Sequence, residues 1–481
     1  AVRRARYDFS KTLVELFHER FLEPFHQWCH SNGTQSRYQA YGHPWLLGML
    51  DGYMVPDIPE GDTWLFNNWD SLDGIRYAVW NKYAASGAHL AGRPLVGCEA
   101  MTNTQGVFRA TLEYVKQATD LSLITGINHF VLHGFNYSPP EAGFPGWVRY
   151  GTYFNEQNPW WPYVPRWADY CARLSHILQK TKPHVQIAIL GPTADVWSRQ
   201  GLDRTPFVNT PGYLHLLWQA IHQNGCSADY VNRTVLEKAT FESGELRFGP
   251  MAYDALIVAN VETLEPATAN AIKRYAQAGG KIAFVGPSPH RSASLPEAQK
   301  HDRSIIQAIE AAQKTRSARV LQVPEPKPNE LLRWTGNLLG TLDVSPSIRF
   351  DPPHERLYQI HHKLGERDLF FLVNLHRSER LAFGATFDVK NKTPWRWDPE
   401  TGSRTVFPGQ CTGNRLQIGL GPLESILLVF EPERAEQSTT RVTRIDPERF
   451  MTLSAPWQAT FECIGLGEPF TRTFTTLVDL A

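Results

Sequence analysis

The sequence lacks the features that mark several large classes of protein. No apolar run approaches the roughly 20 residues that a membrane-spanning helix needs. Lysine plus arginine and aspartate plus glutamate both number 48, so no net charge draws the chain to nucleic acid or to an acidic surface. We therefore expect no membrane span and no nucleic-acid partner, and a neutral partner fits better.

Cysteine patterns and several short functional motifs are also missing. The six cysteines are scattered, without a Cys-x-x-Cys pair or the spacing of a zinc site, which argues against a dense disulfide framework and against zinc. The sequence contains no G-x-G-x-x-G after a strand, no P-loop and no G-x-S-x-G. These absences exclude a Rossmann cofactor site, a P-loop nucleotide site and the common serine hydrolases.

One stretch in the first third of the chain concentrates the candidate chemistry. Apolar runs at residues 95–98 and 130–132 flank a helical pattern at about 106–124, which predicts a strand, a helix and a parallel strand. The polar side chains that close these runs are Glu99 for the first and His133 and Asn136 for the second. Because α/β folds place active sites at the carboxyl ends of parallel strands, we expect a site there.

The same alternation of strand and helix continues on both sides of this stretch. Beyond about residue 323, short alternating runs broken by Pro, Gly and Asn predict an all-β region. Residues 432–443 are polar and charged enough to form a linker, and another β module is expected to begin near Trp457. The further strands that we predict lie at residues 36–40, 185–190, 255–259 and 282–285, and the further helices at about 70–88 and 165–179.

Residues 54–62 carry three carboxylates, Asp57, Glu60 and Asp62, in a segment with two prolines, which predicts an irregular loop. Such a cluster of hard oxygen ligands suits Ca²⁺, although its spacing is not that of an EF-hand. A solvated acidic loop without a metal is the alternative.

Glu99 follows an apolar strand and is flanked by small residues, so its carboxylate has room to face a pocket. Carboxylates are the usual acids and bases at glycosidic bonds. The alternative is a salt-bridged glutamate at a strand end. For His133 the alternatives are a hydrogen bond to a sugar hydroxyl and a satisfied core histidine.

A long loop with several prolines follows, and it carries Asn155, Trp160 and Trp161. Long loops at the active end of an α/β sheet usually form lids or walls of a site. Tryptophan faces stack on sugar rings, but they also fill cores. The alternative is a loop that is pinned by its own hydrophobic residues.

Several motifs, taken together and in order, resemble the α-L-rhamnosidases of glycoside hydrolase family 106. The resemblance covers nearly the whole chain and is far more specific than any one motif. The motifs are DIPE at residues 57–60, CEAMT at 98–102, GINHFVLHG at 126–134, GTYFNEQNPWWP at 151–162, DYVN at 229–232, AGGKIAFVGPSP at 278–289, WDPETG at 397–402 and PLES at 422–425.

The resemblance implies a multidomain protein with α/β and all-β parts. Residues 1–182 would be the C-terminal part of a (β/α)8 TIM-type barrel whose first strands precede Ala1, and residues 183–322 a flavodoxin-like α/β domain. Residues 323–433 would form a β-sandwich. Residues 434–481 would be a linker and the start of a truncated, jelly-roll β-sandwich. We therefore expect the sequence to be part of a longer protein, which would be periplasmic or secreted.

The resemblance also implies inverting hydrolysis of terminal α-L-rhamnose, assisted by Ca²⁺ that touches the sugar. Glu99 would be the general base, and the general acid would lie upstream of Ala1. Glu60 would be a Ca²⁺ or sugar ligand, with the acid as its alternative role. The residues that would line the sugar site are His133, Asn136, Asn155, Trp160 and Trp161.

Two positions beside Glu99 depart from the family pattern. Cys98 stands where alanine or another small residue is expected, and Met101 where an aromatic residue is common. We expect these changes to affect the substrate more than the fold. Two other functions remain open: hydrolysis of another sugar on the same scaffold, and carbohydrate binding without catalysis.

Overall fold

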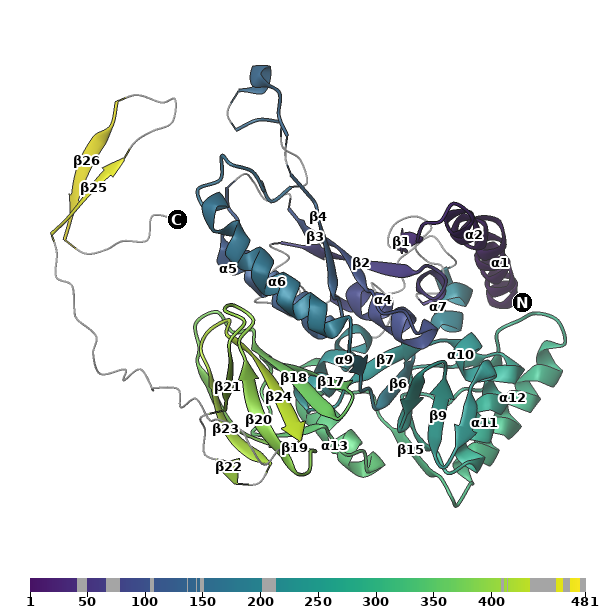
Figure 1. The fold of residues 1–481 in the computed structure, drawn as a ribbon. Helices are drawn as coiled ribbons and strands as arrows, with labels where there is room; N and C mark the ends of the chain where they lie inside the picture. The colour runs from purple at the N-terminus through teal and green to yellow at the C-terminus, as the bar shows by residue number, and fades with distance from the viewer. Residues whose placement is uncertain are drawn as a thin grey trace. The chain divides into compact units, whose positions relative to one another are not determined.

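The computed structural model describes residues 1–40, 50–65, 78–103, 108–135, 137–143, 145–147, 151–200, 213–407, 411–412, 414–432, 456–461 and 468–475 (Figure 1). The chain divides into a large unit, Ala1–Thr439, and a small unit, Thr440–Ala481. In the small unit, β25 (Trp457–Phe461) pairs with β26 (Phe470–Phe474) in antiparallel fashion. Among the described residues, no helix is long and apolar enough to cross a membrane.

A parallel sheet of four strands in chain order begins the large unit. Its strands are β1 (Arg37–Gln39), β2 (Ile58–Trp64), β3 (Gly97–Thr102) and β4 (His129–Leu132). The helices that accompany them are α4 (Ala78–Ala91) between β2 and β3, α5 (Leu112–Thr125) between β3 and β4, and α6 (Val164–Leu178) after β4. Strands that follow one another in order, each with a helix, form the repeating unit of a β/α barrel. The four described strands do not by themselves close one.

The prediction of an irregular loop at residues 54–62 is wrong for the second half of this segment, which forms β2. Proline has no N–H to donate, and Pro59 is tolerated in this strand because no hydrogen-bond donor is needed at that position. Pairing of β2 with β3 begins only one residue later, at Glu60 opposite Gly97. The carboxylates of Glu60 and Asp62 therefore stand on a sheet, whereas Asp57 precedes it.

A second parallel sheet of five strands follows in the order β15-β13-β11-β6-β7, and it confirms the strands predicted at 185–190, 255–259 and 282–285. Its strands are β6 (Ile187–Leu190), β7 (Ala228–Val231), β11 (Ala255–Ala259), β13 (Lys281–Val285) and β15 (Arg319–Val323). Its helices are α7 (Thr193–Gln200), α9 (Leu214–Gln223), α10 (Arg233–Lys238), α11 (Pro266–Gln277), α12 (Ala298–Gln313) and α13 (Leu331–Leu342). Short antiparallel strands β8 (Thr240–Glu242), β9 (Glu245–Phe248) and β10 (Met251–Tyr253) and the parallel pair β12 (Thr263–Leu264) with β14 (Arg291–Ser292) complete this part.

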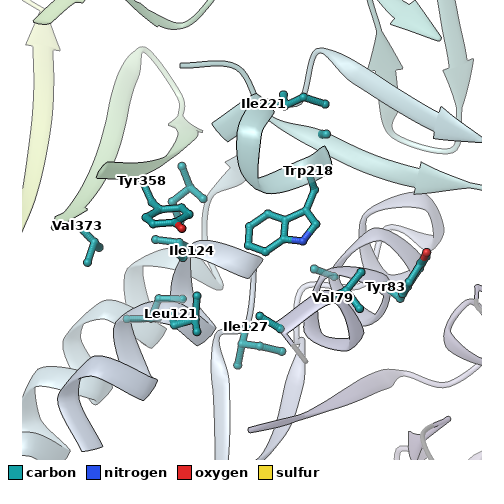
Figure 2. Packing of buried hydrophobic residues seen from close by; sticks show 14 of the residues in the cluster. Val79, Tyr83, Leu121, Ile124, Ile127, Trp218, Ile221, Tyr358 and Val373 are labelled. Carbon is teal, nitrogen blue, oxygen red and sulfur yellow. The ribbon is translucent and has the colours of Figure 1, made fainter. Parts of the chain in front are cut away.

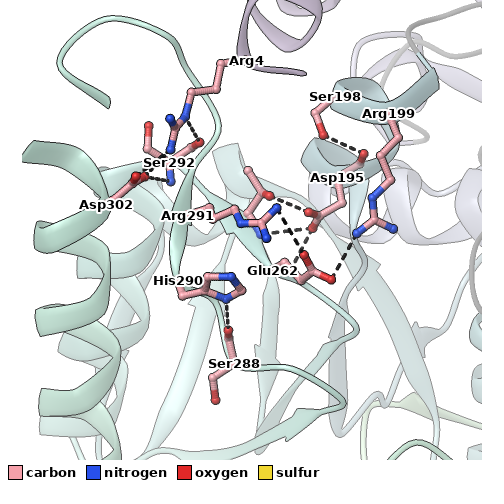
Figure 3. Close-up of polar contacts among 11 residues, drawn as sticks. Arg4, Asp195, Ser198, Arg199, Glu262, Ser288, His290, Arg291, Ser292 and Asp302 are labelled. Carbon is pink, nitrogen blue, oxygen red and sulfur yellow. Dashed lines mark hydrogen bonds and ion pairs between the residues drawn. The ribbon is translucent and has the colours of Figure 1, made fainter. Parts of the chain in front are cut away.

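The N-terminal helix α1 (Val2–Phe17) packs against α7 beside the carboxyl ends of these strands. Arg4 forms an ion pair of 2.6 Å with Asp302, and the Tyr7 hydroxyl donates to Glu265 at 2.5 Å. Figure 3 shows the neighbouring contacts, in which Asp195 accepts hydrogen bonds from the backbone of residues 262 and 263. Doubly wound folds bind ligands at this edge. Here side chains of α1 cover the edge and leave a cavity of only about 40 Å³, so the first sheet is the better place for a substrate.

Residues 331–342 form helix α13, so the all-β region predicted beyond residue 323 is confirmed only from residue 348 on, where two antiparallel sheets form. Their facing sides share one apolar core that includes Phe350, Phe370, Phe383 and Phe430. The first sheet contains β16 (Ile348–Asp351), β19 (Leu381–Phe387), β23 (Arg415–Leu420) and β22 (Cys411–Thr412). The second contains β21 (Arg404–Val406), β20 (Lys392–Trp397), β24 (Ser425–Pro432), β18 (Arg367–Asn374), β17 (Leu357–Leu364) and β5 (Lys182–Pro183).

One apolar cluster joins these three parts of the large unit (Figure 2). The indole of Trp218 on α9 is fully buried within it. The cluster also contains Tyr83 of α4, Ile124 of α5, Tyr358 of β17 and Val373 of β18. Burial of such large side chains contributes about 1.5–3 kcal/mol each. The helices behind the first sheet are therefore fixed to the rest of the unit.

Candidate active site

The first sheet has one polar face and one face that packs on helices. Side chains alternate along a strand, and partners in a parallel register point to the same side. The register aligns Asp62 of β2 with Glu99 of β3, and Glu60 with Gly97. Thus Glu60, Asp62 and Glu99 share one face of the sheet. This is the arrangement that would face the interior of a barrel.

Glu99 lies at the centre of the polar face and is partly open to solvent. Its side chain is 32% exposed, and that of His133 is 42% exposed. His133 Nδ1 lies 2.9 Å from Glu99 Oε1, and Thr102 Oγ1 lies 2.9 Å from the same nitrogen. A protonated Nδ1 would donate to the carboxylate and orient it. A ligand would then contact the other ring nitrogen, Nε2.

Asp62 is a second carboxyl group on this face; the sequence placed it in the acidic cluster with Asp57 and Glu60, but not beside Glu99. Burial raises the pKa of Asp62 to about 7, and the charge of Glu99 adds to the rise. Its Oδ2 accepts a hydrogen bond from the Trp64 indole, whereas Oδ1 is buried without a hydrogen-bond partner among the described residues. A buried acceptor that stays unpaired costs about 1–3 kcal/mol, so this oxygen is suited to a ligand.

Glu60 lies two residues before Asp62 and is also buried. Its Oε2 is 2.7 Å from Arg37 Nε. Burial raises the pKa of Glu60 above its usual range, and the Arg37 charge partly offsets that rise. A side chain at position 97 would lie 3.1 Å from Oε2, so Gly97 leaves the carboxylate the room it occupies.

Helices α4 and α5 hold the strands of this site from behind. Asn81 Oδ1 on α4 accepts from the Asp62 backbone N–H at 2.8 Å. A Cβ at position 61 would lie 2.1 Å from that oxygen, so Gly61 is required for this close approach. Thr63 Oγ1 is 2.8 Å from Ser122 Oγ on α5. These bonds fix the strand segment that carries Asp62.

The strand ends at this edge are irregular. Pairing of β2 and β3 shifts between Asp62 and Trp64, and bulges of this kind occur often beside active sites. Met101, two residues after Glu99, has a φ of 67°, a backbone conformation that costs energy for a residue with a side chain. Both irregularities lie in the strand segments that carry Asp62 and Glu99.

Both departures from the family pattern are fully buried side chains. Cys98 is fully buried, with its Sγ 3.1 Å from Thr63 Oγ1, and burial raises its pKa well above the usual value. Met101 is also fully buried in the apolar cluster. Neither side chain is exposed to solvent, and the expectation that these changes affect the substrate more than the fold stays a prediction.

The aromatic loop is tied to the body of the sheet by its own polar groups. Trp160 Nε1 donates to the Ala110 carbonyl at 2.7 Å, and Asn155 Oδ1 accepts from the Gln157 N–H at 3.0 Å. Trp161 stands edge-on to the exposed Phe135, at 6.1 Å between ring centroids. Asn136 lies outside the described residues. The roles of Asn155, Trp160 and Trp161 as sugar ligands stay predictions.

The polar face carries oxygen donors of the type that a hard divalent cation prefers. Glu60, Asp62 and Glu99 share this face, but among the described residues their oxygens do not all come within 4.8 Å of one another, and Arg37 lies beside Glu60. The unpaired Oδ1 of Asp62 offers a buried oxygen ligand. Carboxylate oxygens are the ligands that Ca²⁺ prefers. The residues present therefore suit Ca²⁺ better than a nitrogen- or sulfur-seeking metal.

Comparison with known proteins agrees with the resemblance that the sequence motifs indicated. The model of glycoside hydrolase family 106, described as alpha-L-rhamnosidase, matches residues 2–407. A protein of Formosa agariphila named "Putative beta-glucuronidase" is 26% identical over 444 residues, which cover 90% of this chain and 34% of that protein. The chain therefore spans about a third of the length of this curated relative.

Solved structures show the same fold. A rhamnosidase from Novosphingobium sp. PP1Y matches 98% of this chain and 44% of its own, with a TM-score of 0.73 and 22% identity. A beta-galactosidase from Rahnella sp. R3 matches 89% of this chain and 68% of its own, with a TM-score of 0.59 and 11% identity. At these identities the likeness establishes the fold alone.

Proposed function

Because the chain belongs to glycoside hydrolase family 106, the α-L-rhamnosidases, we propose that it carries part of the active site of an enzyme that removes terminal α-L-rhamnose from glycans. One observation carries the proposal: Glu99 stands partly exposed within β3, held by His133, on the same face of the sheet as the buried carboxyl groups of Glu60 and Asp62. A neutral sugar also suits a chain without net charge.

In the proposed reaction, Glu99 takes a proton from a water molecule as that water attacks the anomeric carbon. The His133 imidazole orients the carboxylate through its contact with Oε1. The attack comes from the side opposite the leaving oxygen, so the configuration at the anomeric carbon inverts.

The acid that protonates the leaving oxygen is assigned to a residue outside this chain. An inverting pair of carboxyl groups stands ~6.5–9.5 Å apart, so that water fits between base and sugar. Asp62 is the register partner of Glu99 on the next strand, and neighbouring strands are only about 4.8 Å apart. Asp62 is therefore poorly placed to act as the acid.

Glu60 and Asp62 would hold Ca²⁺ in this proposal, because both are buried carboxylates on the face of Glu99. When bound, the ion would supply positive charge to sugar hydroxyls. The protein's own part is to keep the two carboxylates in place, through the backbone bond of Asp62 to Asn81 and the contact of Glu60 with Arg37.

A second candidate is hydrolysis of another sugar on the same scaffold. The similarity to a protein named as a beta-glucuronidase favours this candidate, since Arg37 on the polar face is partly exposed and could meet a sugar carboxylate. Carbohydrate binding without catalysis is the third candidate.

The test is hydrolysis of p-nitrophenyl α-L-rhamnoside, β-D-glucuronide and β-D-galactoside by the purified full-length protein that contains this chain, before and after EGTA. We expect turnover of the rhamnoside, a loss of at least tenfold after EGTA, and recovery with Ca²⁺ but not with Zn²⁺. Preference for the glucuronide would favour the second candidate. Rhamnose binding by calorimetry without turnover of any substrate would favour the third.

A further inference from the structure

A second cluster of metal-binding side chains lies at the opposite end of the first sheet from Glu99. Asp57 directly precedes β2, whereas Asp62 lies five residues further along, roughly 16 Å away at the rise of a β-strand. Next to Asp57 stands α2 (Glu23–Ser31), which follows the π-helical turn His18–Leu22. This helix presents His26 and His30 toward the aspartate.

The three side chains converge on one point. His30 Nε2 lies 2.7 Å from Asp57 Oδ2, and His26 Nδ1 lies 3.6 Å from the same oxygen. One ligand atom from each residue lies within 4.8 Å of the other two. Ligands at the usual 2.0–2.1 Å from a tetrahedral Zn²⁺ are about 3.3 Å apart. A small rotation of the His30 ring, whose side chain is 52% exposed, would open the shorter distance to that value.

The surroundings fix the aspartate more firmly than the histidines. Asp57 Oδ1 is 3.2 Å from Arg93 Nη1, and Oδ2 accepts from the Ser36 N–H at 2.9 Å. The carboxylate is therefore held with Oδ2 turned toward both imidazoles. His26 Nδ1 is 2.7 Å from Ser36 Oγ, a contact that a metal would replace. Such hydrogen bonds around a ligand commonly orient it toward the metal.

The donor set indicates which metal would bind. Two imidazole nitrogens and one carboxylate oxygen suit Zn²⁺ and its neighbours in the transition series, whereas Ca²⁺ prefers oxygen ligands alone. Two histidines four residues apart on a helix present their rings on the same side, the spacing seen in zinc sites. Three protein ligands leave a fourth position for water.

We propose that His26, His30 and Asp57 form a Zn²⁺ site that ties α2 to the start of β2, separate from the carboxylates around Glu99. Its role is structural: it joins the N-terminal helices to the first sheet. Metal binding to the folded protein alone would raise its stability.

The test is titration of the purified, chelator-treated protein with Zn²⁺ by calorimetry, in excess Ca²⁺ so that oxygen sites are filled. We expect one equivalent to bind, and the affinity to fall at least about tenfold in His30→Gln, since loss of a direct ligand should cost at least as much as loss of a supporting residue. His176→Gln, which removes an exposed histidine of α6, should bind Zn²⁺ as the unaltered protein does.

Because His30 is half exposed, the His30→Gln variant should keep the thermal transition of the metal-free protein. Zn²⁺ should then raise the transition temperature of the unaltered protein but not that of the variant. Anomalous diffraction at the zinc absorption edge, with a peak between His26, His30 and Asp57, would support the site without any variant. Absence of that peak, or equal Zn²⁺ affinity in His30→Gln, would overturn the proposal.

Discussion

Glu99→Gln lowers kcat for p-nitrophenyl α-L-rhamnoside by about 10²–10⁴-fold, the usual contribution of a general acid or base. Glutamine keeps the shape of the side chain and can still accept from His133, but its amide cannot take a proton from water. KM should change less than kcat, because the loss concerns the transition state. The measurement is steady-state kinetics of the full-length protein.

The matched control is Glu310→Gln, which neutralises an exposed glutamate of α12 that pairs with Lys314. This variant should keep the rate of the unaltered protein. A Glu99→Gln variant that also kept that rate would show that the base lies elsewhere, even if the rhamnoside is the right substrate.

The second large effect is a loss of stability in acid, which comes from two fully buried histidines near the junction of the three parts of the large unit. Burial lowers the pKa of His222 to about 3, and nearby Lys82 adds to the shift. Burial, together with His89, lowers the pKa of His362 to about 3. Nε2 of His222 accepts from the Ala228 N–H at 3.4 Å, which favours the neutral ring, whereas Nδ1–H donates to the Gln359 carbonyl at 2.9 Å, a bond that partly offsets the lowering of the pKa by burial.

The direction in which stability changes with pH depends on how many protons the folded and the unfolded chain bind. Above pH 6.5 both states carry neutral histidines, so these groups do not change the stability. Between pH 6.5 and about 3, the unfolded chain binds protons that the folded chain refuses, and stability falls as pH falls. At pH 5 each histidine removes about 2 kcal/mol, or about 4 kcal/mol for the two. Urea unfolding at pH 7.5 and pH 5 measures this difference.

In His222→Asn the side-chain amide can still donate to the Gln359 carbonyl, but it cannot be protonated. The variant should be less stable at pH 7.5, because Ala228 N–H loses its acceptor. Its loss of stability between pH 7.5 and pH 5 should nevertheless be smaller by about 2 kcal/mol. An unchanged pH dependence would mean that other groups cause the acid sensitivity. His176→Gln, at an exposed position, should leave the dependence as it is.

Hydrophobic periodicity was enough to predict many of the regular elements. The strand predicted at 255–259 and the helix predicted at about 165–179 appear as β11 and α6, because continuous apolar runs and 3.6-residue spacing are local signals. Proline content misled the prediction for β2. Whether Pro59 disrupts a strand depends on where the pairing with β3 begins, and the sequence alone does not give that register.

The residues of the candidate site were also predicted only in part, because the sequence shows local patterns but not the register of the strands. Glu99 was chosen because a polar residue after an apolar run is a local pattern, although β3 continues to Thr102, so that Glu99 lies within the strand and not at its end. The three acidic residues at 57–62 were treated as one cluster, but the structure separates them: Glu60 and Asp62 share a face with Glu99, while Asp57 meets His26 and His30. Alternation along β2 would have paired Glu60 with Asp62 had the strand been recognised. The histidine spacing on α2 was a signal that the cysteine-based search for zinc overlooked.

The most direct test of the proposed function is a crystal structure of the Glu99→Gln variant with an α-L-rhamnoside bound. We expect the sugar on the polar face of the first sheet, with a single water molecule between its anomeric carbon and residue 99, and a cation beside Glu60 and Asp62. A separate cavity of about 450 Å³ lies between α6 and the region of Trp397, Asp398 and Arg404. A sugar bound in that cavity, with none near residue 99, would contradict the account.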